Sequence, residues 1–346
     1  MSKKFITVGG VQIGGGAPVT VQSMTNTKTE DADATIAQIK KFEIAGCDIA
    51  RVAVPNMEAA RAIAKIKENT TIPIVADIHF DYKLAIESAA AGADKIRINP
   101  GNIGSEDRVK AVADECRRRG IPIRIGVNGG SLEKEILAKY GRVTPEAMLE
   151  SAMGHVRLLN KFDFDDICIS VKASDVPLTV ASYRLLSEKT DYPLHLGVTE
   201  AGTEYMGIVK SAAGIGSLLM DGIGDTIRVS LTAPPEREVT AGIAILKAVG
   251  LRRDGINIVS CPTCGRCNID LISIANSVEE RLKDCKKELT VAVMGCAVNG
   301  PGEASAADFG IAGGKGEGIL FAKGKILKKV PMDMLVDELI SLVEEN

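Results

Sequence analysis

Eight short β-rich runs, each followed by a stretch of helix length, recur over residues 1–251 and constrain the fold more than any other feature. The runs contain many β-branched residues, and the stretches between them carry apolar residues at helical spacing. This alternation favours a (β/α)8 TIM barrel, with a doubly wound open sheet as the competing fold. The predicted strands are Val19–Gln22, Ile49–Val54, Pro73–Asp77, Lys95–Asn99, Ile121–Val127, Asp166–Lys172, Pro193–Val198 and Thr226–Leu231.

The length of the chain indicates a second domain, because its 346 residues exceed one barrel by about a hundred. The repeating pattern stops at the polar turn Arg252–Gly255. We therefore predict a TIM barrel over residues 1–251 and a small α+β domain over residues 252–346. The smaller domain is expected to contain a helix around Leu271–Leu282, a strand Leu289–Met294 and a terminal helix from Met332.

Composition excludes several classes of function. The formal net charge is only −3 and no long Lys/Arg run is present, so nothing indicates binding to nucleic acid or to an anionic membrane. No stretch approaches the ~20 apolar residues of a membrane span, and the N-terminus lacks the apolar core of a secretory signal. We therefore expect a cytoplasmic protein whose eight cysteines are reduced.

Charged residues recur at the carboxyl ends of the predicted strands. Side chains alternate along a strand, so Ile227 and Val229 should pack on helices while Arg228 and Ser230 point into the barrel. Arginine is costly to bury unless it is paired, and barrel enzymes bind substrate at this end. A diphosphate would be the natural partner, because arginine offers bidentate donors to phosphate oxygens. The converging cations are Arg51, Arg97, Arg124, Lys172 and Arg228.

Polar and acidic residues follow the same strand ends, namely Asp77, Asn128 and Glu200. They leave open a second interpretation, in which the cations form internal salt bridges with Asp77 and Glu200 and bind no ligand. His79 and His195, taken alone, fit a buried structural histidine as well as a catalytic one.

The cysteines near the C-terminus are the most specific signal in the sequence. Cys261 and Cys264 lie two residues apart within Cys-Pro-Thr-Cys, and Cys296 follows much later within Gly-Cys-Ala-Val-Asn-Gly-Pro-Gly-Glu. Soft sulfur ligands in this arrangement suit zinc or an iron–sulfur cluster. The fourth ligand stays open: Cys267 would complete a closed four-thiolate site, whereas Glu303 would give an oxygen ligand that substrate can displace.

These motifs closely resemble the family of bacterial 4-hydroxy-3-methylbut-2-enyl diphosphate synthases, the reductive dehydroxylases of the non-mevalonate isoprenoid pathway. The likeness runs nearly from end to end. The matching segments include Ala17–Thr25, Arg51–Pro55, Ala76–Phe80, Arg97–Gly104, Arg124–Leu132, His195–Gly202, Arg228–Leu231 and Gly295–Glu303.

The resemblance implies a [4Fe–4S] cluster held by Cys261, Cys264, Cys296 and Glu303, with Cys267 outside the ligand set. It implies reductive opening of the cyclic diphosphate of methylerythritol, with two electrons delivered by ferredoxin or flavodoxin. Glu200 is the candidate proton donor or acid–base partner, and Glu303 has a catalytic role as the displaceable ligand. The residues implied in substrate binding are Arg51, Asp77, Arg97, Asn99, Arg124, Asn128, Lys172, Arg228 and Ser230.

The order of elements also predicts how the chain assembles. The helix Glu236–Val249 leads away from the barrel mouth for roughly 20 Å, so the cluster domain begins at the opposite end of the barrel. A head-to-tail homodimer, in which each cluster domain covers the partner's barrel, would solve this problem.

Two alternatives belong to other functional classes. One is an electron carrier or zinc-stabilised binding module that uses Cys261, Cys264, Cys267 and Cys296 structurally. The other is a redox-silent barrel enzyme for a phosphorylated metabolite, such as a pterin-diphosphate transferase.

Overall fold

The computed structural model describes residues 2–267, 269–296, 302 and 304–346. The chain forms two compact units, residues 1–251 and residues 252–346. Each unit has its own hydrophobic core. The part of the chain that the structure describes contains no helix long and apolar enough to span a membrane.

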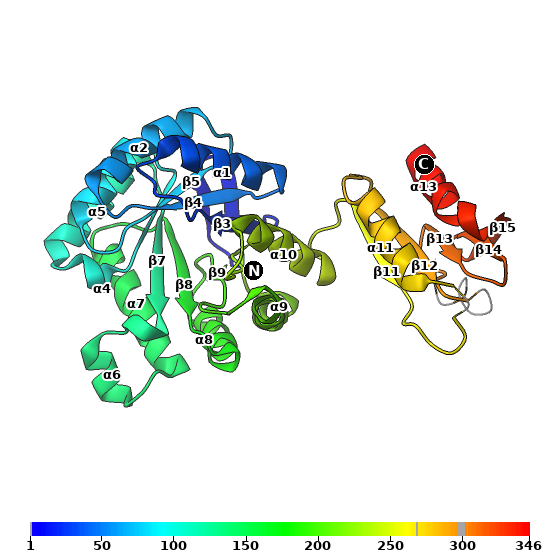
Figure 1. Ribbon diagram of the computed structural model, residues 1–346. Coiled ribbons are helices and arrows are strands. Elements are labelled where there is room, and N and C mark those ends of the chain that lie inside the picture. The colour runs from blue at the N-terminus through cyan, green and yellow to red at the C-terminus, as the bar shows by residue number, and fades with distance from the viewer. Residues whose placement is uncertain (1, 268, 297–301, 303) are drawn as a thin grey trace. The chain divides into compact units, whose positions relative to one another are not determined.

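The first unit is a barrel of eight parallel strands, so the predicted (β/α)8 fold is confirmed. The strands pair in the order β8-β7-β6-β5-β4-β3-β10-β9, and a parallel bridge between Ile169 and Leu194 joins the two ends of the sheet. Figure 1 shows the helices arranged around the outside of these strands. The strands are β3 (Thr20–Met24), β4 (Ile49–Ala53), β5 (Ile74–Asp77), β6 (Lys95–Ile98), β7 (Ile123–Asn128), β8 (Ile167–Lys172), β9 (His195–Leu196) and β10 (Thr226–Ile227).

Local sequence fixes where the barrel helices begin and end. The side chains of Asp31, Asn56 and Asp175 accept hydrogen bonds from backbone N–H groups in the first turns of α1, α2 and α8. Gly120 ends α5 in a left-handed conformation with φ +66°, which a side chain would disfavour. The helices are α1 (Ala32–Ile44), α2 (Met57–Glu68), α3 (Tyr82–Ala90), α4 (Pro100–Ile103), α5 (Glu106–Arg119), α6 (Lys134–Tyr140), α7 (Pro145–Lys161), α8 (Val176–Lys189), α9 (Glu204–Met220) and α10 (Pro235–Ala248).

An N-terminal hairpin that the strand prediction did not include closes the amino end of the barrel. Ile6, Val8 and Ile13 of this hairpin pack with barrel residues that include Ile49 and Cys168, all of them buried. Substrate access is therefore left to the carboxyl ends of the strands. The hairpin consists of β1 (Phe5–Val8) and β2 (Val11–Gly14).

Strands β9 and β10 are shorter than predicted, so Arg228 and Ser230 lie just beyond the end of β10. Beyond the end of β10, two backbone N–H groups donate to acceptors outside the strand pairing. The backbone N–H of Leu231 donates to the Glu238 carboxylate at 3.0 Å, and that of Thr232 donates to the Gly202 carbonyl.

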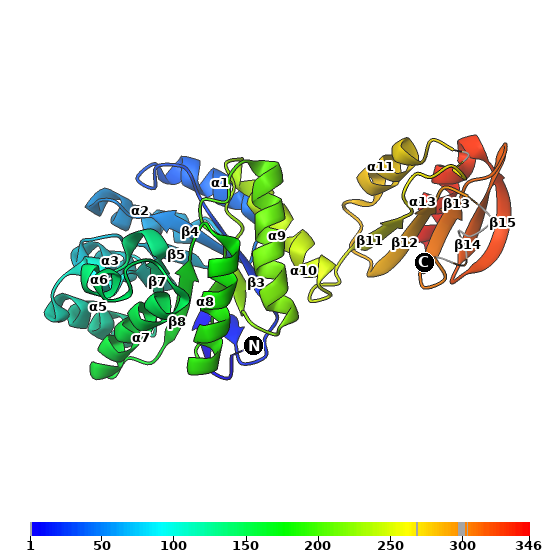
Figure 2. The ribbon, with the colours of Figure 1, turned by 90° about the horizontal axis from the view of Figure 1, so that it is seen from below.

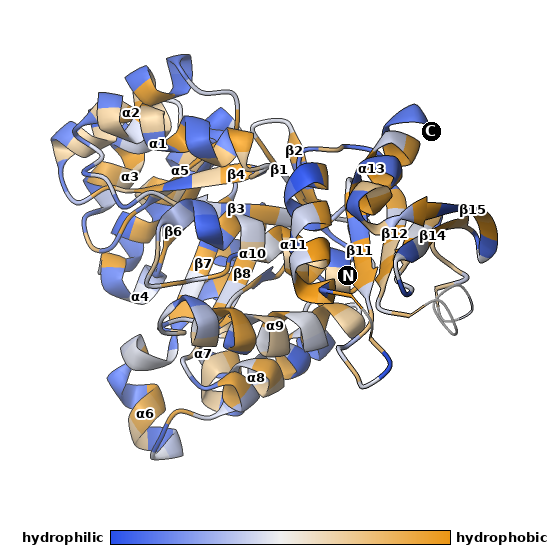
Figure 3. Ribbon diagram, turned by 45° about the vertical axis from the view of Figure 1, so that its right-hand side comes forward, coloured by the Kyte–Doolittle hydropathy of each residue, from blue (hydrophilic) through white to orange (hydrophobic). Residues whose placement is uncertain are grey.

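The second unit is a five-stranded sheet with two helices on one face. Strands β11, β12 and β13 run parallel, and β14 and β15 continue the sheet antiparallel, as Figure 2 lets the reader follow. Apolar residues of both helices pack against alternate residues of the sheet, and hydrophobic segments recur along its strands in Figure 3. The elements are β11 (Ile256–Ser260), α11 (Leu271–Leu282), β12 (Leu289–Met294), β13 (Phe309–Ala312), β14 (Glu317–Ala322), β15 (Lys325–Pro331) and α13 (Leu335–Glu345).

Candidate active site

The cations predicted at the strand ends point into the barrel and are largely buried. The exposed fraction is 1% for Arg124, 6% for Arg97, 7% for Lys172 and 9% for Arg51. Arg228 is less enclosed, with 19% of its side chain exposed. Strand alternation therefore predicted the orientation of these residues correctly.

Asp77 is the carboxylate that organises one side of this interior. Its Oδ2 lies 2.6 Å from Arg51 Nη2 and 3.2 Å from His79 Nε2, and its Oδ1 lies 3.1 Å from Arg97 Nη1. Burial alone would raise the pKa of Asp77, but the charge of Arg51, the hydrogen bond from His79 and the charge of Arg97 hold it well below its usual value. Asp77 is therefore ionised, and Arg51 and Arg97 form internal salt bridges with it.

Arg228 is paired with a carboxylate that the sequence interpretation missed. Arg228 Nε and Nη2 lie 3.1–3.2 Å from the oxygens of Glu238 on α10, and only 4% of the Glu238 side chain is exposed. The signal for Glu238 was present in the sequence, because it occupies the same helix face as the buried Ala241, Gly242 and Ile245.

Arg124 and Lys172 have no carboxylate partner among the described residues. Within the described part of the chain, Arg124 Nε and Nη1 are buried without a hydrogen bond, and no ion pair reaches Lys172. Burial and the neighbouring cations lower the pKa of both residues well below the usual values. Buried donors of this kind require an acceptor, so the interior is suited to an anion.

Lys95 is a further interior cation that strand alternation predicts, since it lies two residues before Arg97, but the site prediction omitted it. It is fully buried, its Nζ lacks a hydrogen-bond partner in the described structure, and burial lowers its pKa to about 8. His195 is also fully buried, and burial together with the charge of Arg124 lowers its pKa well below the usual value. A neutral imidazole in this position fits a core histidine better than an acid catalyst.

Two glycines leave room for the cations. A Cβ atom on Gly126 would lie 2.4 Å from Arg97 Nε, and one on Gly197 would lie 2.6 Å from Lys172 Nζ. Any other residue at these positions would displace the guanidinium or the ammonium group.

The remaining predicted residues lie around the carboxyl ends of the strands. Asn128 and Glu200 line a cavity of about 480 Å³ together with the loop residues Gly129–Ser131, and Glu200 has a backbone φ of +52°, which is uncommon outside glycine. Asn99 is buried and its Oδ1 accepts from the Gly101 backbone N–H at 3.2 Å, while Ser230 is half-buried. None of the five strand-end cations lines this cavity.

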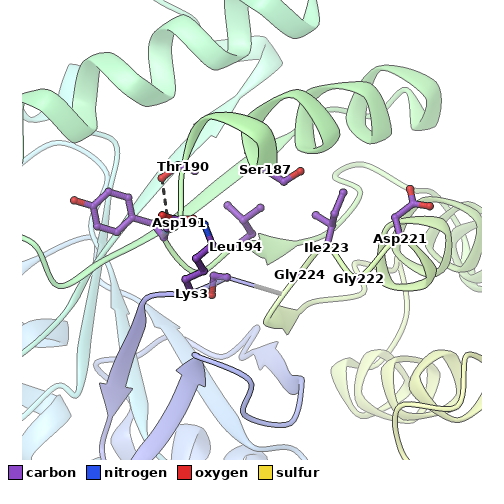
Figure 4. Close-up of a pocket in the computed structure, with 11 residues that line it drawn as sticks. Lys3, Ser187, Thr190, Asp191, Leu194, Asp221, Gly222, Ile223 and Gly224 are labelled. Atoms are coloured by element: carbon purple, nitrogen blue, oxygen red, sulfur yellow. Dashed lines mark hydrogen bonds and ion pairs between the residues drawn. The ribbon is translucent and has the colours of Figure 1, made fainter.

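A second cavity of about 290 Å³ lies near the amino ends of β9 and β10, where Leu194 and Gly224 contribute to its wall (Figure 4). Its polar lining includes Asp191 and Asp221, which form ion pairs with Lys3 and Arg184. None of the predicted site residues lines it. This cavity is therefore a less suitable substrate site than the carboxyl ends.

The cysteines of the second unit follow two neighbouring parallel strands. Cys261 follows β11, Cys296 lies two residues after β12, and Cys264 is exposed in the loop after Cys261. Within the described residues, no group of three or more Cys, His, Asp or Glu side chains is close enough to hold a metal ion. Glu303, the predicted fourth ligand, lies outside the described residues.

The donor chemistry nevertheless suits an iron–sulfur cluster. The Gly295 backbone N–H donates to Cys261 Sγ at 3.1 Å, the kind of hydrogen bond that stabilises a thiolate ligand. Hydrogen bonds from the backbone and side chain of Arg266 lower the pKa of Cys264. In contrast, the Cys267 thiol donates to the Ile269 carbonyl at 3.3 Å. Binding a metal would remove the thiol proton and with it this hydrogen bond.

Comparison with solved structures supports the barrel. Dihydropteroate synthase from Yersinia pestis matches with a TM-score of 0.51 and 14% sequence identity, covering 72% of this chain and 98% of that chain. At this identity the likeness shows the fold alone.

Comparison with curated sequences is far closer. The relative from Ruminiclostridium cellulolyticum is 60% identical and covers 99% of this chain and 97% of its own length. The relative from Caldicellulosiruptor saccharolyticus is 62% identical and covers 98% of this chain and 97% of its own length. The relative from Geobacter sulfurreducens is 60% identical and covers 98% of this chain and 96% of its own length. All three are 4-hydroxy-3-methylbut-2-en-1-yl diphosphate synthases (flavodoxin).

Two family models divide the chain where the structure does. The GcpE TIM-barrel domain matches residues 3–243, and the GcpE protein C-terminal domain matches residues 257–345. With both domains matched in order and relatives about 60% identical over nearly the whole length, the chain belongs to the GcpE family.

Proposed function

We propose that this chain is a 4-hydroxy-3-methylbut-2-enyl diphosphate synthase that reductively opens 2-C-methyl-D-erythritol 2,4-cyclodiphosphate. The observation that carries the proposal is the 60% identity over 99% of the chain to a relative with this activity in its name. The net reaction takes up two electrons and two protons, breaks a carbon–oxygen bond to the ring phosphate, removes one hydroxyl oxygen as water and forms (E)-4-hydroxy-3-methylbut-2-enyl diphosphate.

The barrel interior supplies the diphosphate site. Arg124 and Lys172, which have no carboxylate partner among the described residues, are the principal donors to the phosphate oxygens. Arg51, Arg97 and Arg228 keep further N–H groups beyond those bound to Asp77 and Glu238. Concentrated positive charge favours the ring phosphate as a leaving oxyanion. Asn99, Asn128, Asp77 and Ser230 complete the substrate-binding set.

Glu200 is the candidate proton donor. Its side chain is exposed, it lines the cavity at the carboxyl ends of the strands together with Asn128, and its unusual backbone conformation is typical of functional loops. A Glu200→Gln variant should bind substrate while losing turnover, because it retains the size of the side chain and loses the proton.

Cys261, Cys264, Cys296 and Glu303 would hold a [4Fe–4S] cluster, which supplies single electrons to the substrate when it is bound. The relatives' names support flavodoxin as the donor of those electrons, with ferredoxin as the other candidate. Eight free cysteines agree with a reducing compartment, so we place the reaction in the cytoplasm.

The active site would combine the barrel of one chain with the cluster domain of another in a head-to-tail homodimer. Helix α10 starts after the carboxyl end of β10 and, over 14 residues, leads the chain about 20 Å toward the amino end of the barrel. The cluster domain therefore begins far from its own barrel mouth in the sequence of elements, and a partner can place a cluster there.

The test is an anaerobic assay of the reconstituted protein with the cyclodiphosphate and a strong one-electron reductant. We expect the protein to contain iron and acid-labile sulfide and to form the linear diphosphate. The Cys296→Ser variant should lose both the cluster and the turnover. Cys267→Ser is the matched control and should keep its iron. A protein with one zinc and no sulfide, or without turnover when the cluster is present, would contradict the proposal.

A further inference from the structure

Glu238 reaches the active site from outside the barrel. It lies on α10, which packs on β3 so closely that a Cβ on Gly242 would be 3.0 Å from Val21 Cγ1. A carboxylate buried to this degree is costly unless it is fully paired. Its position on an otherwise apolar helix face therefore calls for a specific reason.

The contacts of Glu238 satisfy both of its oxygens. They accept from Arg228 Nε and Nη2 at 3.1–3.2 Å, from Ser23 Oγ at 3.1 Å and from the Leu231 backbone N–H at 3.0 Å. Ser23 belongs to β3, and Leu231 belongs to the segment after β10. The carboxylate is thus anchored to two strand ends independently of Arg228.

The pairing leaves one edge of the Arg228 guanidinium available. The Nε and Nη2 groups face Glu238, whereas among the described residues Nη1 contacts only the Met24 sulfur, a weak acceptor, at 3.9 Å. Because the guanidinium is planar and rigid, fixing one edge fixes the direction of the other. The charges of Arg51 and Asp77 act on the pKa of Arg228, which therefore lies among the other charged groups of the barrel interior.

We infer that Glu238 is a positioning residue that holds Arg228 by one edge so that the opposite edge can bind the diphosphate. Ser23 and the Leu231 N–H fix the carboxylate, and the carboxylate fixes the guanidinium. The inference rests on the proposed function in so far as that function makes a diphosphate the ligand. It also gives Ser23, within the matching segment Ala17–Thr25, a role that the family resemblance did not supply.

The test measures binding of inorganic pyrophosphate to the anaerobic holoprotein by titration calorimetry. Glu238→Gln keeps the size of the side chain but offers an amide N–H₂ to the guanidinium, so we expect affinity to fall about tenfold. Ser23→Ala should change affinity in the same direction by a smaller factor. Glu236→Gln is the matched control. Glu236 lies on the same helix, its single ion pair in the described structure is a long one of 3.9 Å to Lys41, and the variant should bind pyrophosphate as the native chain does.

A double-mutant cycle distinguishes positioning from a general structural effect. If Glu238 acts through Arg228, then Glu238→Gln should cause no further loss of affinity in an Arg228→Ala background. Equal losses in both backgrounds, or unchanged pyrophosphate affinity in Glu238→Gln, would overturn the inference. If Glu238→Gln does not fold, the same cycle with Ser23→Ala decides.

The outcome is separable from that of the proposed function. Coupling between Glu238 and Arg228 in a protein that binds pyrophosphate but does not convert the cyclodiphosphate would support positioning and contradict the proposed reaction. Turnover of the cyclodiphosphate, together with additive losses of pyrophosphate affinity in the Glu238 and Arg228 variants, would support the proposed reaction and contradict positioning.

Discussion

Lys172 and Arg51 share the barrel interior but differ in whether a carboxylate neutralises them. Arg51 is bound to Asp77 at 2.6 Å, whereas Lys172 has no ion pair in the described structure. Removing a cation from a buried pair leaves the carboxylate under-satisfied, and removing an unpaired cation does not. The two residues should therefore respond differently to the same substitution.

We expect Lys172→Met to weaken pyrophosphate binding at least about tenfold while leaving the melting temperature unchanged or higher. Arg51→Met should weaken binding and also lower the free energy of unfolding by about 1–3 kcal/mol, because Asp77 loses a donor. Calorimetric binding and thermal unfolding of both variants check this. Equal destabilisation by the two substitutions would show that Lys172 has a partner after all.

Lys95 predicts a pH dependence of stability. Burial lowers its pKa from 10.5 to about 8, so the folded state holds this proton more weakly than the unfolded state. The resulting loss of folding stability has its full size below pH 8. It decreases as the pH rises from 8 toward 10.5 and then disappears. At pH 7 it amounts to about 3 kcal/mol.

The Lys95→Met variant should therefore be more stable than the native chain at pH 7, and this advantage should shrink at pH 10. Urea unfolding at both values measures the difference, with Lys40→Met as the exposed-lysine control. A difference that does not change with pH would mean that Lys95 has the same pKa in the folded and the unfolded protein, as a paired ammonium group could have.

Among the elements, the strand β9 shows how backbone and site depend on each other. A Cβ on Gly197, just after β9, would lie 2.6 Å from Lys172 Nζ and 2.7 Å from the Arg228 carbonyl oxygen. The ammonium could move, but the carbonyl belongs to the backbone and could not move without shifting the end of β10. The close approach of these segments thus fixes the position of two site residues.

Gly197→Ala should consequently reduce pyrophosphate affinity about tenfold and lower the melting temperature by several degrees. Gly154→Ala on α7 is the control, since its nearest contact would be Arg157 Nη2 at 3.9 Å, and alanine favours a helix. Native affinity in Gly197→Ala would show that the interior has room which the structure does not indicate.

The elements differ in how far sequence alone could predict them. The inward orientation of Arg97 and Arg124 followed from the alternation of side chains along their strands. The early end of β10 could not be predicted, because the Leu231 backbone N–H, four residues further on, donates to the Glu238 side chain instead of to a strand partner. Strand β11 was missed although Ile256 and Ile258 alternate with the more exposed Asn257 and Val259, because none of its residues is fully buried and its pattern is short.

At the scale of the whole molecule, the two chemistries of the chain reside in separate units. The buried cations belong to residues 1–251, and the three candidate thiolate ligands belong to residues 252–346. A reaction that needs both must bring a barrel and a cluster domain together, within one chain or between two. The proposed homodimer selects the second possibility, and the two can be distinguished by activity.

Co-expression of a Cys296→Ser chain with an Arg228→Ala chain should restore activity if the site is shared between chains. Random pairing makes about half of the dimers mixed, and each mixed dimer has one intact site, so about a quarter of the native activity is expected. Two cluster-defective chains, Cys296→Ser and Cys264→Ser, should give none when paired. A site formed within one chain would give no recovery in the first mixture.

The converse experiment tests the shared site by loss of activity instead of recovery. A chain with both Cys296→Ser and Arg228→Ala should inactivate every native chain with which it pairs, because each shared site would then contain one defective half. At equal amounts, about half of the native chains' activity should be lost. If the native chain kept all of its activity in such mixed dimers, each barrel would be using its own cluster, and the return of the chain along α10 would have to be overcome within a single molecule.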